Sequence, residues 1–177
     1  MLYNHAFDGY IESMKSSAAA AFVVLALSGA AHAQQGAAFA TAGPPGMSER
    51  YLQRAGEVVI HALALMGVNY RYGGDSPLTG FDCSGLVVHV VQQVAGIMLP
   101  RSAHDMSRVG RSVTPDDLEP GDLVFFNTLH RPYSHVGIYL GNHRFIHAPS
   151  RGRAVEVVNM SDSYWQARYN GARRLTL

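Results

Sequence analysis

The stretch Phe81-Asp82-Cys83-Ser84-Gly85-Leu86-Val87 opens the segment that decides the fold, an apolar run that continues to Ala95 and stops at Gly96. Projected at 100° per residue, the run has one apolar side and one polar side. The apolar side carries Cys83, Leu86, Val87, Val90 and Val94. The pattern predicts an amphipathic helix over Cys83–Ala95, closed by Gly96, with Cys83 facing a sheet.

Cys83 is the only cysteine among 177 residues, which excludes an internal disulfide and any multi-cysteine metal site. In the first turn of a helix, unpaired backbone N–H groups and the positive end of the helix dipole favour a thiolate. We therefore expect the pKa of this thiol to be lowered into the range of roughly 3.5 to 7.5. From the helix alone, a small buried core residue explains Cys83 equally well.

The remaining pattern places helices first and strands afterwards. Ser48 can cap a helix that ends near Gly67, and its expected buried face has apolar side chains at three- and four-residue spacing: Leu52, Ala55, Val59, Leu63 and Met66. Residues 69–80 have no periodicity and are expected to form a loop, and residues 102–108 are expected to form a short helix. Short apolar or alternating runs follow Pro120, at 123–126, 135–140, 144–148, 154–158 and 172–175. This order predicts an α+β domain, with N-terminal helices packed on a C-terminal antiparallel sheet.

Two histidines lie on neighbouring strands of that predicted sheet. On the first strand, His135, Gly137 and Tyr139 share one face. A three-residue turn over 141–143 sets His147 opposite Gly137, so both histidines share a face. Gly137 has no side chain and leaves room for the His147 ring. A two-residue turn would instead put the two histidines on opposite faces. With Cys83, the pair supplies a thiol, an imidazole that takes its proton, and a second ring that fixes the first one's tautomer.

Five motifs follow one another along the chain: Phe81–Val87, Leu99-Pro100-Arg101-Ser102, Pro120–Phe126, His135–Gly141 and Phe145-Ile146-His147-Ala148. Together they resemble the successive motifs of NlpC-type cell-wall cysteine peptidases. The resemblance covers nearly all of the domain. It implies a papain-like fold and hydrolysis of peptide bonds in peptidoglycan stem peptides, commonly next to diaminopimelate.

The same resemblance assigns roles to individual positions. Cys83 is similar to the family's nucleophile, His135 to its base and His147 to its third polar residue. Tyr70, within Tyr70-Arg71-Tyr72-Gly73-Gly74, matches a tyrosine near the family's oxyanion site. Asp82 and Ser84 match residues that line its substrate groove. Two other functions stay open: an amidase that cuts between sugar and stem peptide, and a catalytically silent wall-binding module.

The N-terminal residues have the three parts of a secretory signal. Lys15 precedes a ten-residue apolar stretch, residues 18–27, and Ala31-His32-Ala33 ends it. We expect a signal peptide over 1–33, with translation starting at Met14, a flexible leader over 34–47 and the peptidase domain over 48–177. The mature protein is therefore expected to be exported, either periplasmic or secreted.

Composition and charge exclude several classes of partner. A formal net charge of +1 without a long basic run argues against nucleic acid, and ten apolar residues are too short for a stable membrane span. We predict no metal and no cofactor, a monomer, and peptidoglycan stem peptides as the binding partner. The C-terminal arginines are expected on a solvated surface; they are Arg151, Arg153, Arg168, Arg173 and Arg174.

Overall fold

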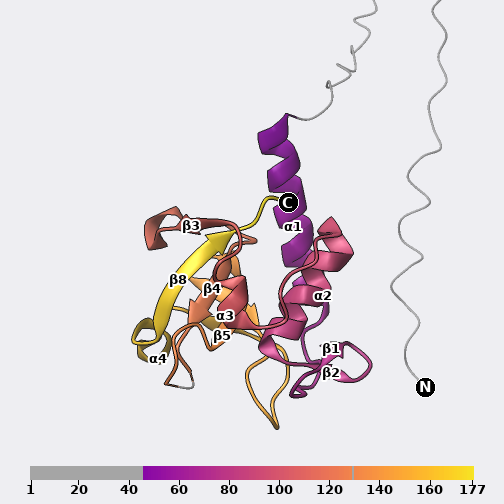
Figure 1. The fold of residues 1–177 in the computed structure, drawn as a ribbon, viewed down its shortest axis with the longest axis vertical. Coiled ribbons are helices and arrows are strands. Elements are labelled where there is room, and N and C mark those ends of the chain that lie inside the picture. The colour runs from indigo at the N-terminus through magenta and orange to yellow at the C-terminus, as the bar shows by residue number, and fades with distance from the viewer. Residues whose placement is uncertain (1–45, 129) are drawn as a thin grey trace, which may run out of the picture. The chain divides into compact units, whose positions relative to one another are not determined.

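The computed structural model describes residues 46–128 and 130–177. The predicted signal peptide and all but the last two residues of the predicted leader lie outside the described residues. Two long helices lie on one side of an antiparallel sheet (Figure 1). The elements are α1 (Met47–Ala64), β1 (Asp75–Ser76), β2 (Gly80–Phe81), α2 (Cys83–Ala95), α3 (Ala103–Met106), β3 (Arg111–Val113), the 3₁₀ turn Pro115–Asp117, β4 (Leu123–Phe126), β5 (His135–Gly141), β6 (Arg144–His147), β7 (Glu156–Asn159), α4 (Ser163–Gln166) and β8 (Tyr169–Arg174).

The six-stranded sheet has the order β3-β8-β4-β5-β6-β7, and every neighbouring pair is antiparallel. The predicted α+β class with N-terminal helices and a C-terminal antiparallel sheet is confirmed. The expected loop over 69–80 contains β1, which pairs with β2 in a separate two-stranded sheet. The strand β3 and the helix α4 were not predicted, because neither is longer than four residues.

The sheet buries apolar side chains on both faces. Towards the helices, Val136 and Ile138 of β5 belong to the same core cluster as Leu86 and Val87 of α2. On the opposite face a second cluster gathers the buried side chains of Val113, Val124, Phe126, Tyr139, Phe145 and Ala172, with Trp165 of α4 packed against it. Since side chains alternate along a strand, β5 directs His135 to the second face and Val136 to the helices.

The helix α1 uses a different face from the one its apolar spacing predicts. Its buried side chains are Ala55, Val58 and Ala62, whereas Leu52 and Met66 are exposed. The reason is close packing: a Cβ added at Gly121 would lie 3.0 Å from the Cβ of Ala55, so only small side chains fit there. The predicted cap is also wrong, because the helix starts after Gly46, where the Glu49 carboxylate accepts from the Gly46 N–H.

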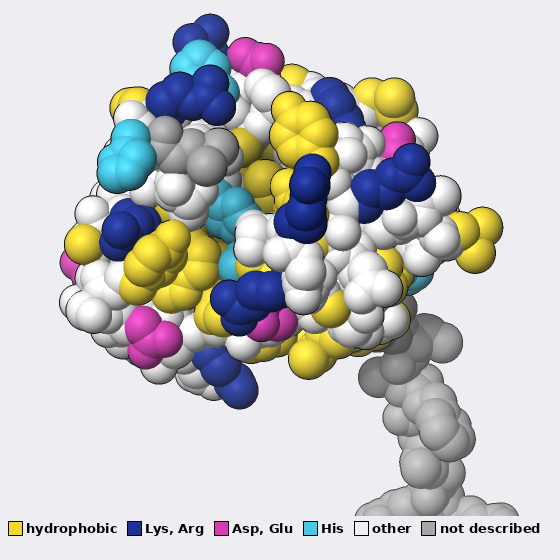
Figure 2. Space-filling view, turned by 90° about the horizontal axis from the view of Figure 1, so that it is seen from below, with side chains coloured by type: hydrophobic (Ala, Val, Ile, Leu, Met, Phe, Trp, Pro, Cys, Tyr) yellow, Lys and Arg dark blue, Asp and Glu magenta, His cyan; other side chains and the backbone are white. Residues whose placement is uncertain are grey.

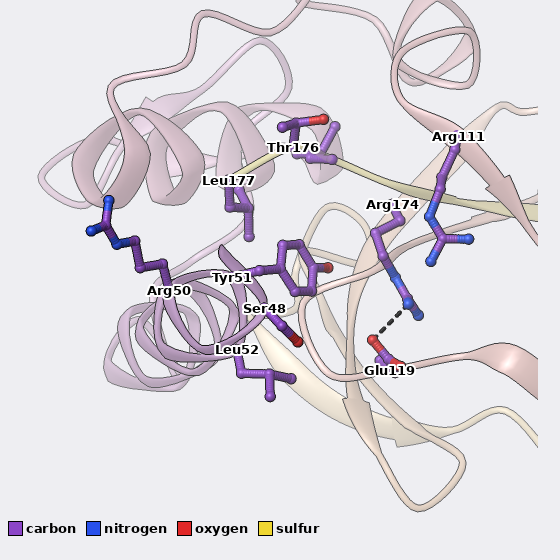
Figure 3. Close-up of a pocket in the computed structure, with 10 residues that line it drawn as sticks. Ser48, Arg50, Tyr51, Leu52, Arg111, Glu119, Arg174, Thr176 and Leu177 are labelled. Atoms are coloured by element: carbon purple, nitrogen blue, oxygen red, sulfur yellow. Dashed lines mark ion pairs between the residues drawn. The ribbon is translucent and has the colours of Figure 1, made fainter. Parts of the chain in front are cut away.

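Arg174 joins the last strand to the segment before β4 and is buried, contrary to the expected solvated surface. Its Nε donates to Asp122 Oδ1 and an Nη donates to Asp122 Oδ2, both at 2.7 Å, and Asp122 is fully buried. Figure 3 shows its ion pair with Glu119, at 2.6 Å, beside Tyr51 of α1. This paired and hydrogen-bonded charge holds the C-terminal strand in place, since losing one partner would leave the other buried and unpaired.

The hairpin between β5 and β6 differs from the expected three-residue turn. Its turn has two residues, Asn142 and His143, both at positive φ as a type I′ turn requires. A bulge at Gly141 supplies the extra residue, so Ile138 still pairs with Ile146 and the two histidines keep a common face.

The neighbours nearest to Gly137 belong to Phe145 and Ile146. A Cβ at this position would lie 2.5 Å from the Phe145 ring and 2.7 Å from the Ile146 carbonyl oxygen. The missing side chain therefore makes room for the Phe145 ring.

Candidate active site

The start of α2 is fixed by Asp82, which caps the helix. Its Oδ1 accepts from the Gly85 N–H at 2.7 Å, so Cys83 becomes the first helical residue. Gly85 has to be glycine because a Cβ there would lie 2.0 Å from the Gly74 carbonyl oxygen. The loop around Gly74 and the first turn of α2 therefore touch backbone to backbone, which sets the position of Cys83.

Arg101 holds the capping residue Asp82 in place through hydrogen bonds. Its guanidinium donates to both carboxylate oxygens of Asp82, at 2.7 and 3.0 Å, to Ser84 Oγ at 2.7 Å, and to the Gly74 carbonyl at 2.9 Å. Burial raises the pKa of Asp82, but the hydrogen bonds from Arg101 and Gly85 outweigh it and hold the pKa below its usual value. Asp82 is therefore an anion that organises the helix start.

Cys83 lies in a cavity of about 550 Å³ that His135 and Tyr70 also line. Figure 2 shows this face hollowed, with histidine side chains at the base of the hollow and arginine side chains on its rim. Arg101 and Arg131 line the cavity. The thiol and the imidazole meet at the end of the sheet, because His135 is the first residue of β5.

The predicted low thiol pKa is wrong in direction. Burial raises the pKa of Cys83 to about 11, although hydrogen bonds from the backbone of Val136 and Ser84 lower it in part. Burial lowers the pKa of His135 to about 4. At neutral pH the site therefore holds a neutral thiol and a neutral imidazole.

His147 lies behind His135. Nε2 of His135 is 2.7 Å from Nδ1 of His147, and both rings are buried. Burial, His135 and Arg153 together lower the pKa of His147 to about 2, so this ring also stays neutral. With one His135 nitrogen engaged by His147, its Nδ1 is left to face other groups.

Trp165 covers the two histidines from α4. Its indole is stacked on His135 at a centroid distance of 5.9 Å and meets His147 edge-on at 5.0 Å. It also packs against Phe126 and Phe145 of the second core cluster. Trp165 therefore links the imidazole pair to the aromatic side chains of the second core cluster.

The structure brings most of the predicted site residues together. Cys83, His135, Tyr70, Asp82 and Ser84 line one cavity. His147 instead lines an adjoining cavity that shares His135. The side chains of Asp82 and Ser84 bond to each other at 3.0 Å, as well as to Arg101, so they support the helix start as well as lining the cavity.

Two residues of the site were missed from the sequence. Arg101 stands in the quoted motif Leu99–Ser102, which was the available signal, but its partners lie 17 to 27 positions away along the chain. For Trp165, only the fold places the side chain against His135 and His147.

Across residues 46–128 and 130–177, no group of three or more histidine, cysteine or acidic side chains could hold a metal ion. Among the helices of that same part of the chain, none is long and apolar enough to cross a bilayer.

Solved structures similar to this chain define the class of protein to which the domain belongs. The fold matches the crystal structure of an NlpC/P60 family protein from Bacillus cereus ATCC 10987, with a TM-score of 0.65 and 32% identity over 70% of this chain and 40% of that one. It matches the NlpC/p60 domain of the peptidoglycan hydrolase SagA with a TM-score of 0.60 and 31% identity over 68% of this chain and 98% of that one. Both place the domain in the papain-like class. The NlpC/P60 family matches residues 67–174, and the chain belongs to that family.

Proteins of similar sequence are also named as hydrolases or endopeptidases. A gamma-DL-glutamyl hydrolase of Bacillus subtilis (strain 168) is 48% identical over 118 residues, which are 66% of this chain and 28% of the relative. The murein DD-endopeptidase MepH of Escherichia coli (strain K12) is 43% identical over 129 residues, 70% of this chain and 47% of the relative. The chain thus spans about a quarter to a half of the length of these relatives.

Proposed function

We propose that the protein is an exported cysteine peptidase that hydrolyses peptide bonds in peptidoglycan stem peptides, next to diaminopimelate. The observation that carries the proposal is one cavity lined by Cys83 and His135, with His147 bonded to His135 at 2.7 Å. A nucleophile, a base and a group that orients the base are the parts that acyl transfer needs.

In the proposed reaction, the Cys83 sulfur attacks the scissile carbonyl carbon while His135 accepts the thiol proton. His135 then gives that proton to the leaving amine as the C–N bond breaks, which leaves a thioester on Cys83. A water molecule attacks the thioester carbonyl carbon and gives a proton to His135. The C–S bond then breaks, the Cys83 sulfur takes the proton from His135, and the carboxylic acid is released. Because thiol and imidazole both start neutral, proton transfer accompanies the attack.

Tyr70 is the proposed side-chain donor to the developing oxyanion. It lines the cavity of Cys83. Burial, and after it the nearby Cys83, raise the pKa of Tyr70, so its hydroxyl keeps its proton and can donate. The first backbone N–H groups of α2, at the helix start where Cys83 lies, would complete the donor set.

The names of the relatives support hydrolysis of peptide bonds that involve D-amino acids. One relative is named a gamma-DL-glutamyl hydrolase and the other a murein DD-endopeptidase. Stem peptides carry free carboxylates, and Arg131 on the cavity wall supplies a cation for them.

Digestion of purified peptidoglycan, followed by mass spectrometry of the fragments, tests the assignment. Peptide fragments that end or begin at diaminopimelate, with the bond between sugar and alanine intact, support it. Release of whole stem peptides from the sugar would instead show that the protein is an amidase. Binding without any cleavage would make it a wall-binding module.

Export is a separate proposal that rests on the N-terminal pattern. Signal peptidase cleavage after Ala33 leaves Gln34 as the first residue. N-terminal sequencing of the exported protein measures this directly, and a mature species that still contains residues 18–27 would contradict it.

A further inference from the structure

Behind His147 lies a carboxylate that the reaction described above does not use. Glu156 of β7 is paired directly with His147 of β6 across the sheet, so the two side chains stand side by side on one face. Oε1 of Glu156 is 3.6 Å from Nε2 of His147. Nε2 of His147 is buried and has no hydrogen-bond partner among the described residues, and the acceptor that faces it is Oε1 of Glu156, which is ion-paired with Arg153. A buried ring nitrogen without a hydrogen bond calls for an explanation, and the carboxylate beside it supplies one.

Glu156 is itself held in place by Arg153. A guanidinium nitrogen of Arg153 lies 2.6 Å from Oε1 and donates to Oε2 at 2.7 Å. The carboxylate is about 30% exposed, whereas the imidazole of His147 is about 1% exposed. The Glu156 carboxylate therefore extends from the surface to the buried His147 ring, and its ion pair with Arg153 fixes its orientation.

The geometry assigns Glu156 as a positioning residue that selects the tautomer of His147, an inference that rests on the proposed function. In a neutral imidazole, one nitrogen carries the proton and the other accepts. A carboxylate beside Nε2 favours the tautomer with the proton on Nε2, because the other one would aim a lone pair at a negative oxygen.

The tautomer of His147 in turn determines the tautomer of His135. With its proton on Nε2, His147 has a bare Nδ1, which accepts from Nε2–H of His135 at 2.7 Å. His135 then has its own lone pair on Nδ1, which is the state needed to take the Cys83 proton. In the opposite tautomer, His147 would donate, and Nδ1 of His135 would already carry a proton. Glu156 therefore acts on the thiol through two imidazoles.

Arg153 has a second effect in this arrangement. After burial and His135, its charge further lowers the pKa of His147 and prevents that ring from becoming a cation. The charged and titratable groups around His147 are His135 from β5, Glu156 from β7 and Arg153 from the preceding loop, with Asp162 lining the same cavity of about 440 Å³. His147 thus stays neutral while its tautomer is selected.

The test reads the tautomer directly by ¹⁵N NMR of the histidine-labelled protein at pH 7, with His147→Asn used to assign the His147 signals. We expect a protonated, pyrrole-type Nε2 and a pyridine-type Nδ1 on His147. In Glu156→Ala both tautomers should be populated, and kcat on a stem peptide should fall about tenfold with KM unchanged. Glu156→Gln keeps an acceptor oxygen and should lie between the two.

Glu57→Ala, which removes a carboxylate from the surface of α1, is the matched control and should change neither readout. A wild-type His147 protonated on Nδ1, or tautomer populations unchanged in both Glu156 variants, overturns the inference. If the wild type cuts no stem peptide, the proposed function fails, but the wild-type and Glu156 spectra still decide the role of Glu156. If Glu156→Ala does not fold, the wild-type spectrum and Glu156→Gln decide.

Discussion

Nε2 of His135 and Nδ1 of His147 are 2.7 Å apart on neighbouring strands, inside an aromatic enclosure completed by Trp165. The contact leaves Nδ1 of His135 to face other groups, while burial lowers the pKa of both rings and keeps them neutral. The proposed chemistry therefore depends on a pair of uncharged imidazoles that the sheet register brings together.

His147 should be important for rate but not for binding. His147→Ala removes the partner of His135 and is expected to lower kcat by about 10²-fold with little change in KM, less than the loss in His135→Ala. His147→Asn places an amide oxygen near the position of Nδ1 and should recover about a tenth of the wild-type kcat. Steady-state kinetics on a defined stem peptide measures all three variants. Undiminished kcat in His147→Ala would remove His147 from the catalytic group.

Tyr70→Phe removes one hydroxyl from the cavity wall. If that hydroxyl donates to the oxyanion, kcat should fall more than KM rises, by roughly 10- to 10²-fold when backbone donors remain. Tyr51→Phe is the matched control, because it removes the hydroxyl of a tyrosine on α1 that lines a different cavity. An equal effect of both substitutions, or none of either, would contradict the role of Tyr70.

Two glycines in helices should respond in opposite ways to alanine. Gly85→Ala forces a Cβ to within 2.0 Å of the Gly74 carbonyl oxygen and should lower the free energy of unfolding by about 3 kcal/mol. Gly56→Ala in α1 meets nothing within 4 Å and should raise it by about 0.5 to 1 kcal/mol. Urea unfolding of the two variants gives both values. A Gly85→Ala protein as stable as the wild type would disprove the close backbone contact at the helix start.

Acid should destabilise the fold through the two buried histidines. Their pKa values in the folded state, about 4 for His135 and about 2 for His147, lie below the usual 6.5. Below pH 6.5, these two histidines therefore bind protons in the unfolded chain that they do not bind in the folded chain. The free energy of unfolding falls as the pH falls from 6.5 towards 4. For two such groups the loss between pH 6.5 and pH 5 is about 3 kcal/mol.

His147→Asn should roughly halve that pH dependence, because asparagine does not titrate. Unfolding free energies measured in urea at several pH values test this for both proteins. The same slope in the wild type and in His147→Asn would show that His147 takes up its proton in the folded state.

The sequence predicted the class of fold and the cluster of reactive residues, because both depend on local patterns. The 3.6-residue repeat located α2, with Cys83 at its start, and strand alternation located His135. The common face of the histidines was predicted from the wrong turn, and a bulge at Gly141 restored the register.

Contacts between distant parts of the chain could not be read from local patterns. The small-residue face of α1 reflects the close approach of Gly121 to Ala55, which apolar spacing does not reveal. The thiol pKa was predicted in the wrong direction, because a helix start suggests a lowered value and only the fold shows how deeply Cys83 is buried. Trp165 joins the site from a segment that carries no local sign of it, and Arg101 comes from a recognisable motif whose partners lie 17 to 27 positions away.

The central claim is that the Cys83 thiol cuts stem peptides, and a comparison of wild type with Cys83→Ala on a defined stem peptide tests it most directly. The substrate contains D-glutamate and diaminopimelate, and mass spectrometry follows its cleavage while circular dichroism confirms that both proteins are folded. Because Cys83 contributes a small side chain, the variant should fold normally and lose at least about 10³-fold in kcat. A folded Cys83→Ala protein that cleaves the peptide within about tenfold of the wild-type rate would contradict the account.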